Sequence, residues 1–294
     1  MFKKIFFLSF FVFQLIFSQK NNLLFMTPKG IPSIVVKKLS ETSTFSNNTI
    51  SYTIEENPTN LITSIMKKKA DIAIVPSNVI KNIIDKNLPY TIIGTVGEGS
   101  FYLLGYDNIT EYSDLKNTPL GINGKGMTPD ILAQHILKNK GVTTANLQYY
   151  PSATDTAFML LNKKIHYAII PEPLVSLVLA KNSDIKILMD LNKEWKNMEK
   201  TNFGYPQSTL IIKTELLKTQ PNFVEKFLKQ YQNSLIFLLK NPNSSIYNEY
   251  NLSKNSIHRF NVLPNFPSKE NNLKEYNLFF KTIGREEINE KHFK

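Results

Sequence analysis

Apolar residues in this chain form short continuous runs that alternate with longer stretches of helical spacing. Runs of this kind predict buried strands, and apolar positions three or four residues apart between the runs predict helices. Strands that alternate with helices of this length predict an α/β fold with parallel sheets and right-handed crossovers. The predicted strands cover residues 23–27, 49–54, 71–75, 119–122, 147–150 and 167–170.

The two halves of this strand series repeat each other at an offset of about 95 residues. The stretch 68–76 aligns without gaps on the stretch 163–171, and each follows an apolar helical pattern. Upstream, each copy has a strand-like run that ends in a Lys-Gly turn, at Lys29 and at Lys125. We therefore predict two similar strand-and-helix units; chance similarity in a sequence rich in Lys and Ile is the alternative.

The last part of the chain is predicted to be mostly helical. Residues 203–212 have the pattern of a strand, whereas 221–239, 244–251 and 269–283 have helical patterns. One strand is too few for a separate sheet, so this part is expected to complete the first lobe.

The chain is therefore expected to pass between two lobes twice, around residues 99–106 and 200–207. The first lobe would comprise residues 21–103 plus 205–294, and the second lobe residues 106–202. Two such crossings make a hinge, and three sequential domains are the alternative.

The N-terminus has the pattern of an export signal, predicted at residues 1–18 with cleavage after Ser18. Lys3 and Lys4 precede an apolar stretch that is shorter than the roughly 20 residues of a membrane span. The protein is expected to be exported to the periplasm or another extracytoplasmic space. Because Ile16 is bulky for a cleavage site, an uncleaved N-terminal anchor is the alternative.

Composition excludes several kinds of chemistry. The sequence contains no cysteine, which excludes disulfides, thiolate metal sites and a lipid-modified cysteine. The formal net charge is +11, but the lysines are dispersed and only two arginines occur, so no nucleic-acid binding is expected.

No Ser-His-Asp set is recognisable, and no catalytic residue, metal site or cofactor is predicted. The histidines lack metal-ligand spacing; they are His135, His166, His258 and His292.

Both Lys-Gly turns are predicted to lie where ligands of open parallel sheets bind, beyond the carboxyl ends of the strands. Helix N-termini at these turns would attract anionic groups. In the second turn, glycines allow close backbone approach, Thr128 suits the N-cap, and Pro129 suits the first helical position. Asp71 begins its strand at the opposite end and is expected to be structural.

Polar side chains that follow the two repeated prolines are expected at the same edge. Glu172 could bind a ligand amine or cap its own helix, and Tyr205 near the return crossing could contact a ring. The predicted ligand-binding residues are Thr27, Lys29, Gly30, Ser77, Asn78, Gly124, Lys125, Gly126, Met127, Thr128, Glu172 and Tyr205.

Four segments in this order resemble the nitrate/sulfonate/taurine-type solute-binding proteins of ABC importers, a family that includes receptors for pyrimidine precursors of thiamine. The segments are 26–30, 70–76, 124–130 and 172–173, and the resemblance covers roughly residues 21 to 215. It implies a type II periplasmic-binding-protein fold, a two-lobed α/β clamshell with two hinge crossings.

The resemblance also implies a function. A small polar or anionic organic solute would be captured between the lobes and delivered to an ABC permease in the cytoplasmic membrane, by a monomer without a cofactor. An enzyme of the same fold, of the menaquinone-pathway type that acts on a small carboxylate, is the alternative. Those enzymes are cytoplasmic, so the export signal favours the receptor.

Overall fold

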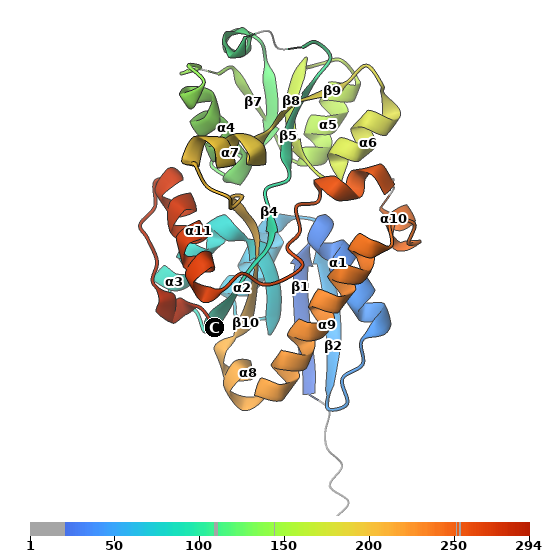
Figure 1. The fold of residues 1–294 in the computed structure, drawn as a ribbon, viewed down its shortest axis with the longest axis vertical. Helices are drawn as coiled ribbons and strands as arrows, with labels where there is room; N and C mark the ends of the chain where they lie inside the picture. Colours follow the sequence, from blue (N-terminus) through green and yellow to red (C-terminus); the bar gives the residue numbers. More distant parts are fainter. Residues whose placement is uncertain (1–20, 109–110, 144, 251, 253) are drawn as a thin grey trace, which may run out of the picture.

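The computed structural model describes residues 21–108, 111–143, 145–250, 252 and 254–294. The predicted export signal lies outside these residues. Two lobes are stacked along the long axis, and each is a sheet of five strands with helices on both faces (Figure 1). Within the described part of the chain, no helix is both long enough and apolar enough to span a membrane.

The first sheet has the strand order β2-β1-β3-β10-β4. Strands β1, β2 and β3 are parallel, whereas β10 is antiparallel to both of its neighbours. The strands are β1 (Asn21–Pro28), β2 (Asn48–Glu55), β3 (Ile72–Pro76), β4 (Tyr90–Glu98) and β10 (Pro206–Lys213).

The second sheet repeats this plan with the order β7-β6-β8-β5-β9, and β5 takes the antiparallel place of β10. Its strands are β5 (Phe101–Gly105), β6 (Leu120–Asn123), β7 (Leu147–Tyr150), β8 (Tyr167–Pro171) and β9 (Lys186–Asp190). The prediction of parallel strands is confirmed for the six strands of the two repeated units, and the antiparallel strands β10 and β5 lie outside those units. Both β5 and β10 enter from the other lobe, so they run opposite to the strands that end at the boundary between the lobes.

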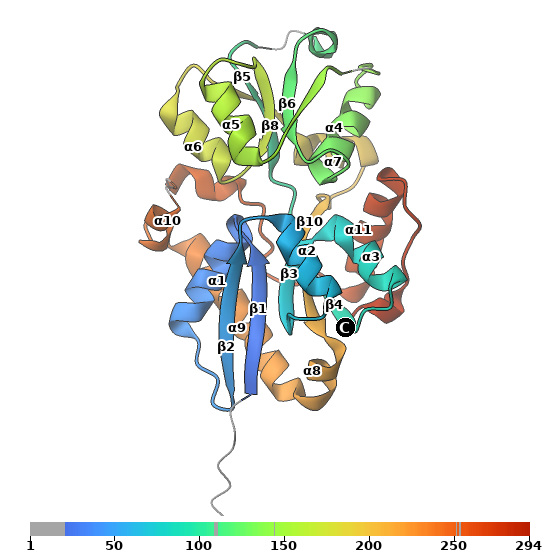
Figure 2. The same ribbon diagram turned by 180° about the vertical axis from the view of Figure 1, so that it is seen from behind.

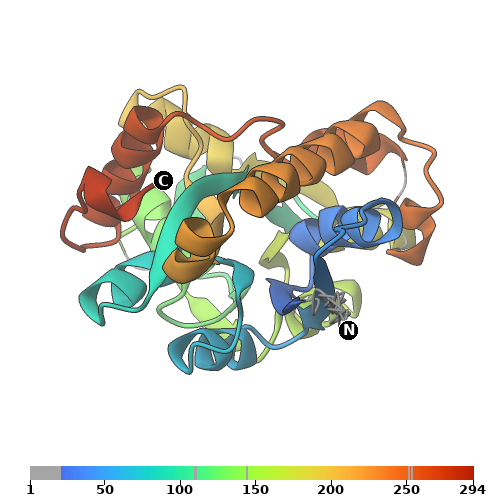
Figure 3. The ribbon, with the colours of Figure 1, turned by 90° about the horizontal axis from the view of Figure 1, so that it is seen from below.

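Helices cover both faces of each sheet (Figures 1 and 2). On the first sheet α1, α9 and α10 pack on one face, and α2, α3 and α11 pack on the other. The view from below shows α9 beside α1 (Figure 3). On the second sheet α4 and α7 pack on one face and α5 and α6 on the other. These helices are α1 (Ile31–Thr42), α2 (Pro58–Met66), α3 (Ile80–Asp85), α4 (Thr128–Asn139), α5 (Ala153–Leu161), α6 (Leu174–Lys181), α7 (Leu191–Glu199), α9 (Pro221–Lys240), α10 (Ile246–Glu249) and α11 (Lys269–Thr282).

Strand β3 shows why its sequence is continuously apolar. Ile72 and Ile74 pack with α1 and α9, whereas Ala73 and Val75 pack with α2 and α11. Since successive side chains of a strand point to opposite faces, a strand covered on both faces has to be apolar at every position.

The sequence repeat corresponds to a repeated helix, turn and strand. Helices α2 and α5 begin after equivalent N-cap residues, Asn57 and Ser152, whose side chains each accept a backbone amide hydrogen bond. Each helix is followed by a lysine with positive φ, 57° at Lys68 and 55° at Lys163. The strands β3 and β8 then start at equivalent positions and end at the two repeated prolines.

The two crossings pack directly on each other at the hinge. The Gly99 amide donates to the Tyr205 carbonyl oxygen at 3.0 Å, and the Phe101 amide donates to the Tyr205 hydroxyl at 3.4 Å. Tyr205 is fully buried, and its ring lies so close to Gly99 that a Cβ atom there would be 1.9 Å from the Tyr205 Cζ atom. Residue 99 therefore has to be glycine for this ring to occupy the hinge.

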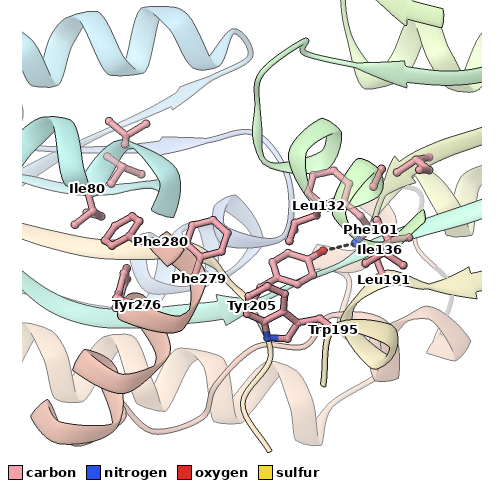
Figure 4. Close-up of a cluster of buried hydrophobic side chains, with 14 of the residues drawn as sticks. Ile80, Phe101, Leu132, Ile136, Leu191, Trp195, Tyr205, Tyr276, Phe279 and Phe280 are labelled. Carbon is pink, nitrogen blue, oxygen red and sulfur yellow. Dashed lines mark hydrogen bonds between the residues drawn. The ribbon is translucent and has the colours of Figure 1, made fainter. Parts of the chain in front are cut away.

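An apolar cluster continues through the hinge from one lobe to the other (Figure 4). The Trp195 ring of α7 lies with its centroid 6.1 Å from that of Tyr205 and 6.4 Å from that of Phe279 in α11. The same cluster includes Ile80 of the first lobe and Leu132 of the second. The lobes are thus joined by buried packing as well as by the covalent crossings.

We predict that Gly99→Ala lowers the free energy of unfolding by about 1–3 kcal/mol, because the added methyl group overpacks against a ring that has no room to move. Urea unfolding measures the loss. Gly97→Ala near the end of β4 is the control, since its Cβ atom would be 3.8 Å from the Cβ atom of Ser208, an ordinary contact. Equal losses for the two variants would contradict the packing argument.

Candidate functional site

The carboxyl ends of the parallel strands in both sheets lie at the boundary between the lobes. Strand β3 ends at Pro76, which pairs with Ser208 just after the return crossing, and β8 ends at Pro171, which pairs with Phe101 just after the first crossing. We call the segments that follow β1, β3, β6 and β8 the inter-lobe edge. The predicted site residues, apart from Tyr205, lie on it or at the ends of these strands.

The turn after β1 uses its polar groups internally. The Gly30 amide donates to the Ser33 hydroxyl at 3.2 Å, and Gly30 has φ of 137°, a conformation that favours glycine. The Lys29 ammonium group pairs with Glu56 at 2.7 Å, and both side chains are exposed. Thr27 is fully buried at the end of the strand. Glu56 was not foreseen as the partner of Lys29.

The turn after β6 contains Gly124 and Gly126, with φ of 72° and 74°. Helix α4 begins at Thr128, so Met127 is its N-cap and no side chain caps it from that position. The prediction of Thr128 as N-cap is therefore wrong, and Pro129 occupies the second helical position rather than the first.

Asp130 provides the acceptor that Thr128 was expected to supply. Its Oδ2 atom accepts the Gly126 amide at 2.7 Å, while its Oδ1 atom accepts hydrogen bonds from Gln134 at 2.7 Å and from the Tyr149 hydroxyl at 2.9 Å. The carboxylate is buried and sits at the positive end of the helix dipole. Burial, and then this bond and the charge of Asp130, raise the pKa of Tyr149 to about 12. The Lys125 ammonium group lies 5.5 Å from the Tyr149 ring centroid.

Ser77 and Asn78 follow β3 and differ in their contacts. The Ser77 hydroxyl is fully buried and bonds to the Thr209 hydroxyl at 2.8 Å, and Thr209 in turn bonds to Tyr276. Asn78 is 8% exposed, and its Oδ1 atom has no hydrogen-bond partner among the described residues. Asn123, the last residue of β6, likewise has a buried Oδ1 atom without a partner in the part of the chain described.

Glu172 makes the contact that links the lobes at this edge. Its side chain is fully buried, and its Oε1 atom lies 2.5 Å from Nε of Arg259, which precedes the Phe260 side chain in the core of the first lobe. The Glu172 carboxylate also accepts the backbone amide and hydroxyl of Ser176 in α6, so it caps its own helix. Arg259 was missed because it lies 87 residues from Glu172 in the sequence.

Tyr205, predicted to contact the ligand, and Asp71, predicted to be structural, both lie away from the inter-lobe edge. Tyr205 is part of the buried hinge described above. Asp71 lies at the opposite end of β3, where its carboxylate accepts the Leu24 amide at 2.8 Å and pairs with Lys213 at 2.8 Å. Asp71 therefore ties β1, β3 and β10 together.

A cluster of charged groups lies beside the hinge. Glu98, at the end of β4, pairs with Lys196 of α7 at 3.1 Å. Glu275 of α11 is buried, and its Oε2 atom accepts the Thr95 hydroxyl at 3.1 Å. Burial, and then the negative charge of Glu98, raise the pKa of Glu275 to about 8, although Thr95 and Lys196 oppose the shift. Glu275 is therefore mostly protonated at neutral pH.

Two surface cavities lie away from the inter-lobe edge. One, of about 360 Å³, lies between the loop that precedes β2 and the start of α9, and is lined by Phe45, Asn48 and Lys226 among others. The other, of about 330 Å³, lies beside the end of α4 and is lined by His135 and Val142 among others.

Comparison with known proteins gives one family and many similar folds. The family model described as NMT1/THI5 like matches residues 45–245. No curated protein sequence matches the chain.

Three solved structures illustrate the similarity of fold. An ABC transporter protein from Parabacteroides distasonis has a TM-score of 0.74 and 20% identity, over 94% of this chain and 99% of that one. The ligand binding component of an ABC-type import system from Staphylococcus aureus, with zinc bound, has a TM-score of 0.72 and 13% identity, over 93% and 96%. The periplasmic aliphatic sulphonate binding protein SsuA from Escherichia coli has a TM-score of 0.69 and 13% identity, over 90% and 93%. These matches show the two-lobed periplasmic-binding-protein fold.

We predict that Glu275→Gln removes a pH dependence of stability. Between about pH 4.5 and pH 8 the folded protein retains a proton on Glu275 that the unfolded chain has released, so the free energy of unfolding falls as pH rises, by up to about 1.4 kcal/mol per pH unit. Glu275→Gln keeps the shape without the charge and should be the more stable protein at pH 8. Urea unfolding at several pH values measures both effects.

The control for this prediction is Glu270→Gln in the first turn of the same helix, where the carboxylate is exposed and pairs with Lys274. It should leave the pH profile almost unchanged. If Glu275→Gln kept the original profile, the buried carboxyl group would not be the cause.

Proposed function

Because this chain belongs to the NMT1/THI5-like family, we propose that it is an extracytoplasmic solute-binding receptor of an ABC importer, which captures a small polar or anionic organic solute between its two lobes without converting it. Its partners would be the solute and a permease in the cytoplasmic membrane, and it would act as a monomer. Two proteins of similar structure, an ABC transporter protein and the ligand binding component of an ABC-type import system, support this role.

One observation carries the proposal: two sheets of the same strand order present the carboxyl ends of their parallel strands to each other across a hinge. In open α/β sheets this end of the strands is where loops and helix N-termini bind ligands. Placing two such ends face to face allows a solute to be enclosed from both sides. We place the hinge at Gly99 and Ser100 on the first crossing and at Gly204 and Tyr205 on the return.

The proposed solute contacts come from the inter-lobe edge. We assign them to the turn after β1, to Asn78 and to the turn at 124–128, and we assign Glu172 a role in closure, because its side chain is buried and paired with Arg259. The hydroxyl of Ser77 and the ring of Tyr205 support these segments from behind, since both are fully buried and engaged with β10 or the first crossing.

The ion pair between Glu172 and Arg259 supports closure of the lobes. It joins the second lobe to the C-terminal part of the first, and it is largely removed from solvent. Opening the lobes would expose both groups to water, and closing them over a solute would restore the pair. This contact therefore influences how readily the receptor closes.

The first functional prediction is that a cognate solute stabilises the mature protein and is recovered unchanged. A ligand that binds only the folded state raises the free energy of unfolding by about 2.7 kcal/mol at a hundredfold excess over its Kd. Thermal unfolding with fractions of a metabolite extract identifies the stabilising solute, and mass spectrometry after incubation tests for conversion. Formation of a product would favour the enzyme alternative.

The second functional prediction is that Glu172→Gln loosens closure. The neutral amide retains the shape but loses the charged pair with Arg259, so small-angle scattering should give a larger radius of gyration for the ligand-free variant and affinity should fall about tenfold, which corresponds to about 1.4 kcal/mol.

Asp71→Asn is the matched control, because it removes a carboxylate paired with Lys213 at the end of β3 that faces away from the other lobe. It should lower the free energy of unfolding by about 1–2 kcal/mol without changing the radius of gyration or the affinity. The opposite ranking of the two variants would place the binding site at the other edge of the sheets.

A further inference from the structure

Three groups of the inter-lobe edge that would attract an anion already have partners within the chain. The Gly126 amide donates to Asp130, and the Gly30 amide donates to Ser33. Lys29 is paired with Glu56. Each turn therefore already contains the acceptor that a bound sulfonate or carboxylate would otherwise supply.

Among these partners, Asp130 has the largest effect on the binding of an anion. Its carboxylate is 3% exposed and lies at the N-terminus of α4, so the position that favours a negative charge already holds one. A second anion that approached the Gly126 amide would meet like-charge repulsion from Asp130, whereas the exposed Lys125 ammonium group of the same turn would attract it. The Gly126 amide is already engaged by Asp130 and is therefore a poor anchor for an anionic ligand.

Two carboxamides at the same edge are in the opposite situation. The Oδ1 atoms of Asn78 and Asn123 are buried and, within the described residues, neither accepts a hydrogen bond. Asn78 follows β3 of the first lobe, and Asn123 ends β6 of the second. Four side-chain amide oxygens are buried without a partner in the described residues, and Asn78 and Asn123 hold the two that lie at the inter-lobe edge. Because an unpaired buried acceptor destabilises the fold, these two atoms indicate groups that a ligand completes.

Resting on the proposed function, we propose that the solute is uncharged and has an N–H donor beside an acceptor, as in a carboxamide, a urea or a lactam, and that Asn78 and Asn123 bind it from opposite lobes. A side-chain carboxamide has both a donor and an acceptor, so it pairs with such a group through two hydrogen bonds. Sulfonates and carboxylates, which have acceptors only, leave the two Oδ1 atoms unpaired.

Matched sets of small probes test the class of solute. Acetamide, acetate and methanesulfonate form one set, and benzamide, benzoate and benzenesulfonate another. Saturation-transfer NMR on the full mature chain should show binding of the amide in at least one set and at least tenfold weaker binding of its anionic counterparts. Asn78→Leu and Asn123→Leu should each weaken amide binding at least tenfold.

The outcomes separate this inference from the receptor function. Preferential binding of an anionic probe would overturn the assignment of solute class and leave the receptor role standing. Amide binding that survives both substitutions would overturn the role of the two carboxamides. If no amide binds, the inference is wrong, and if no fraction of a metabolite extract stabilises the protein either, the receptor role fails as well.

A measurement without ligand gives a second, independent test. Asn78→Leu should raise the unfolding temperature of the ligand-free protein by about 2–4 °C, because it removes an unpaired buried amide. Asn272→Leu is the matched control: this buried asparagine accepts the Thr95 amide at 3.1 Å and donates to the Pro267 carbonyl oxygen at 3.0 Å, so its loss should lower the unfolding temperature. A decrease for Asn78→Leu as large as that for Asn272→Leu would show a structural role and overturn the inference.

Discussion

The contact of the Tyr205 ring with Gly99 is the constraint on which the arrangement of the lobes depends. It brings the two crossings together, so that β5 and β10 start from one buried point and run in opposite directions into their sheets. Because each of these strands pairs with the end of a repeated strand, β8 or β3, the same contact also brings the inter-lobe edges of both sheets next to the hinge. The hinge packing and the inter-lobe edges of both sheets therefore lie on the same two strands.

Much of this fold could be predicted from the sequence because the stretches 68–76 and 163–171 repeat each other without gaps. The turns at Lys68 and Lys163, the strands that follow them and the helices α9 and α11 are all local features, determined by spacing within a few residues. The antiparallel places of β5 and β10 could not be read in this way. An apolar run predicts a strand covered on both faces, but the direction of that strand relative to its neighbours depends on where the chain enters the sheet.

The sequence predicts which turns form the candidate site, but it does not predict how their polar groups are paired. The sequence shows the glycines and the helix start that follow β6. It does not show that the Asp130 carboxylate accepts the Gly126 amide, because an acidic residue in a first helical turn is common. Glu172 and Arg259 meet only because two lobes close on each other, and no local pattern connects them. Only polar groups that have no partner within the protein are free to bind a ligand. These groups can be identified only once the hydrogen bonds and ion pairs of the folded chain are known.

Internal pairing also affects the free-energy difference between the open and closed states of such a receptor. Oppositely charged partners meet at the lobe boundary and beside the hinge, in Glu172 with Arg259 and in Glu98 with Lys196. These pairs stabilise a closed arrangement before any solute is present, so a solute has to contribute only the remaining difference in free energy between open and closed states. In our proposal the unpaired Oδ1 atoms of Asn78 and Asn123 act in the other direction, because closure without a solute would leave them buried and unpaired. Selectivity would then depend on which solutes donate to these atoms, while the ion pairs would set the free energy of closure.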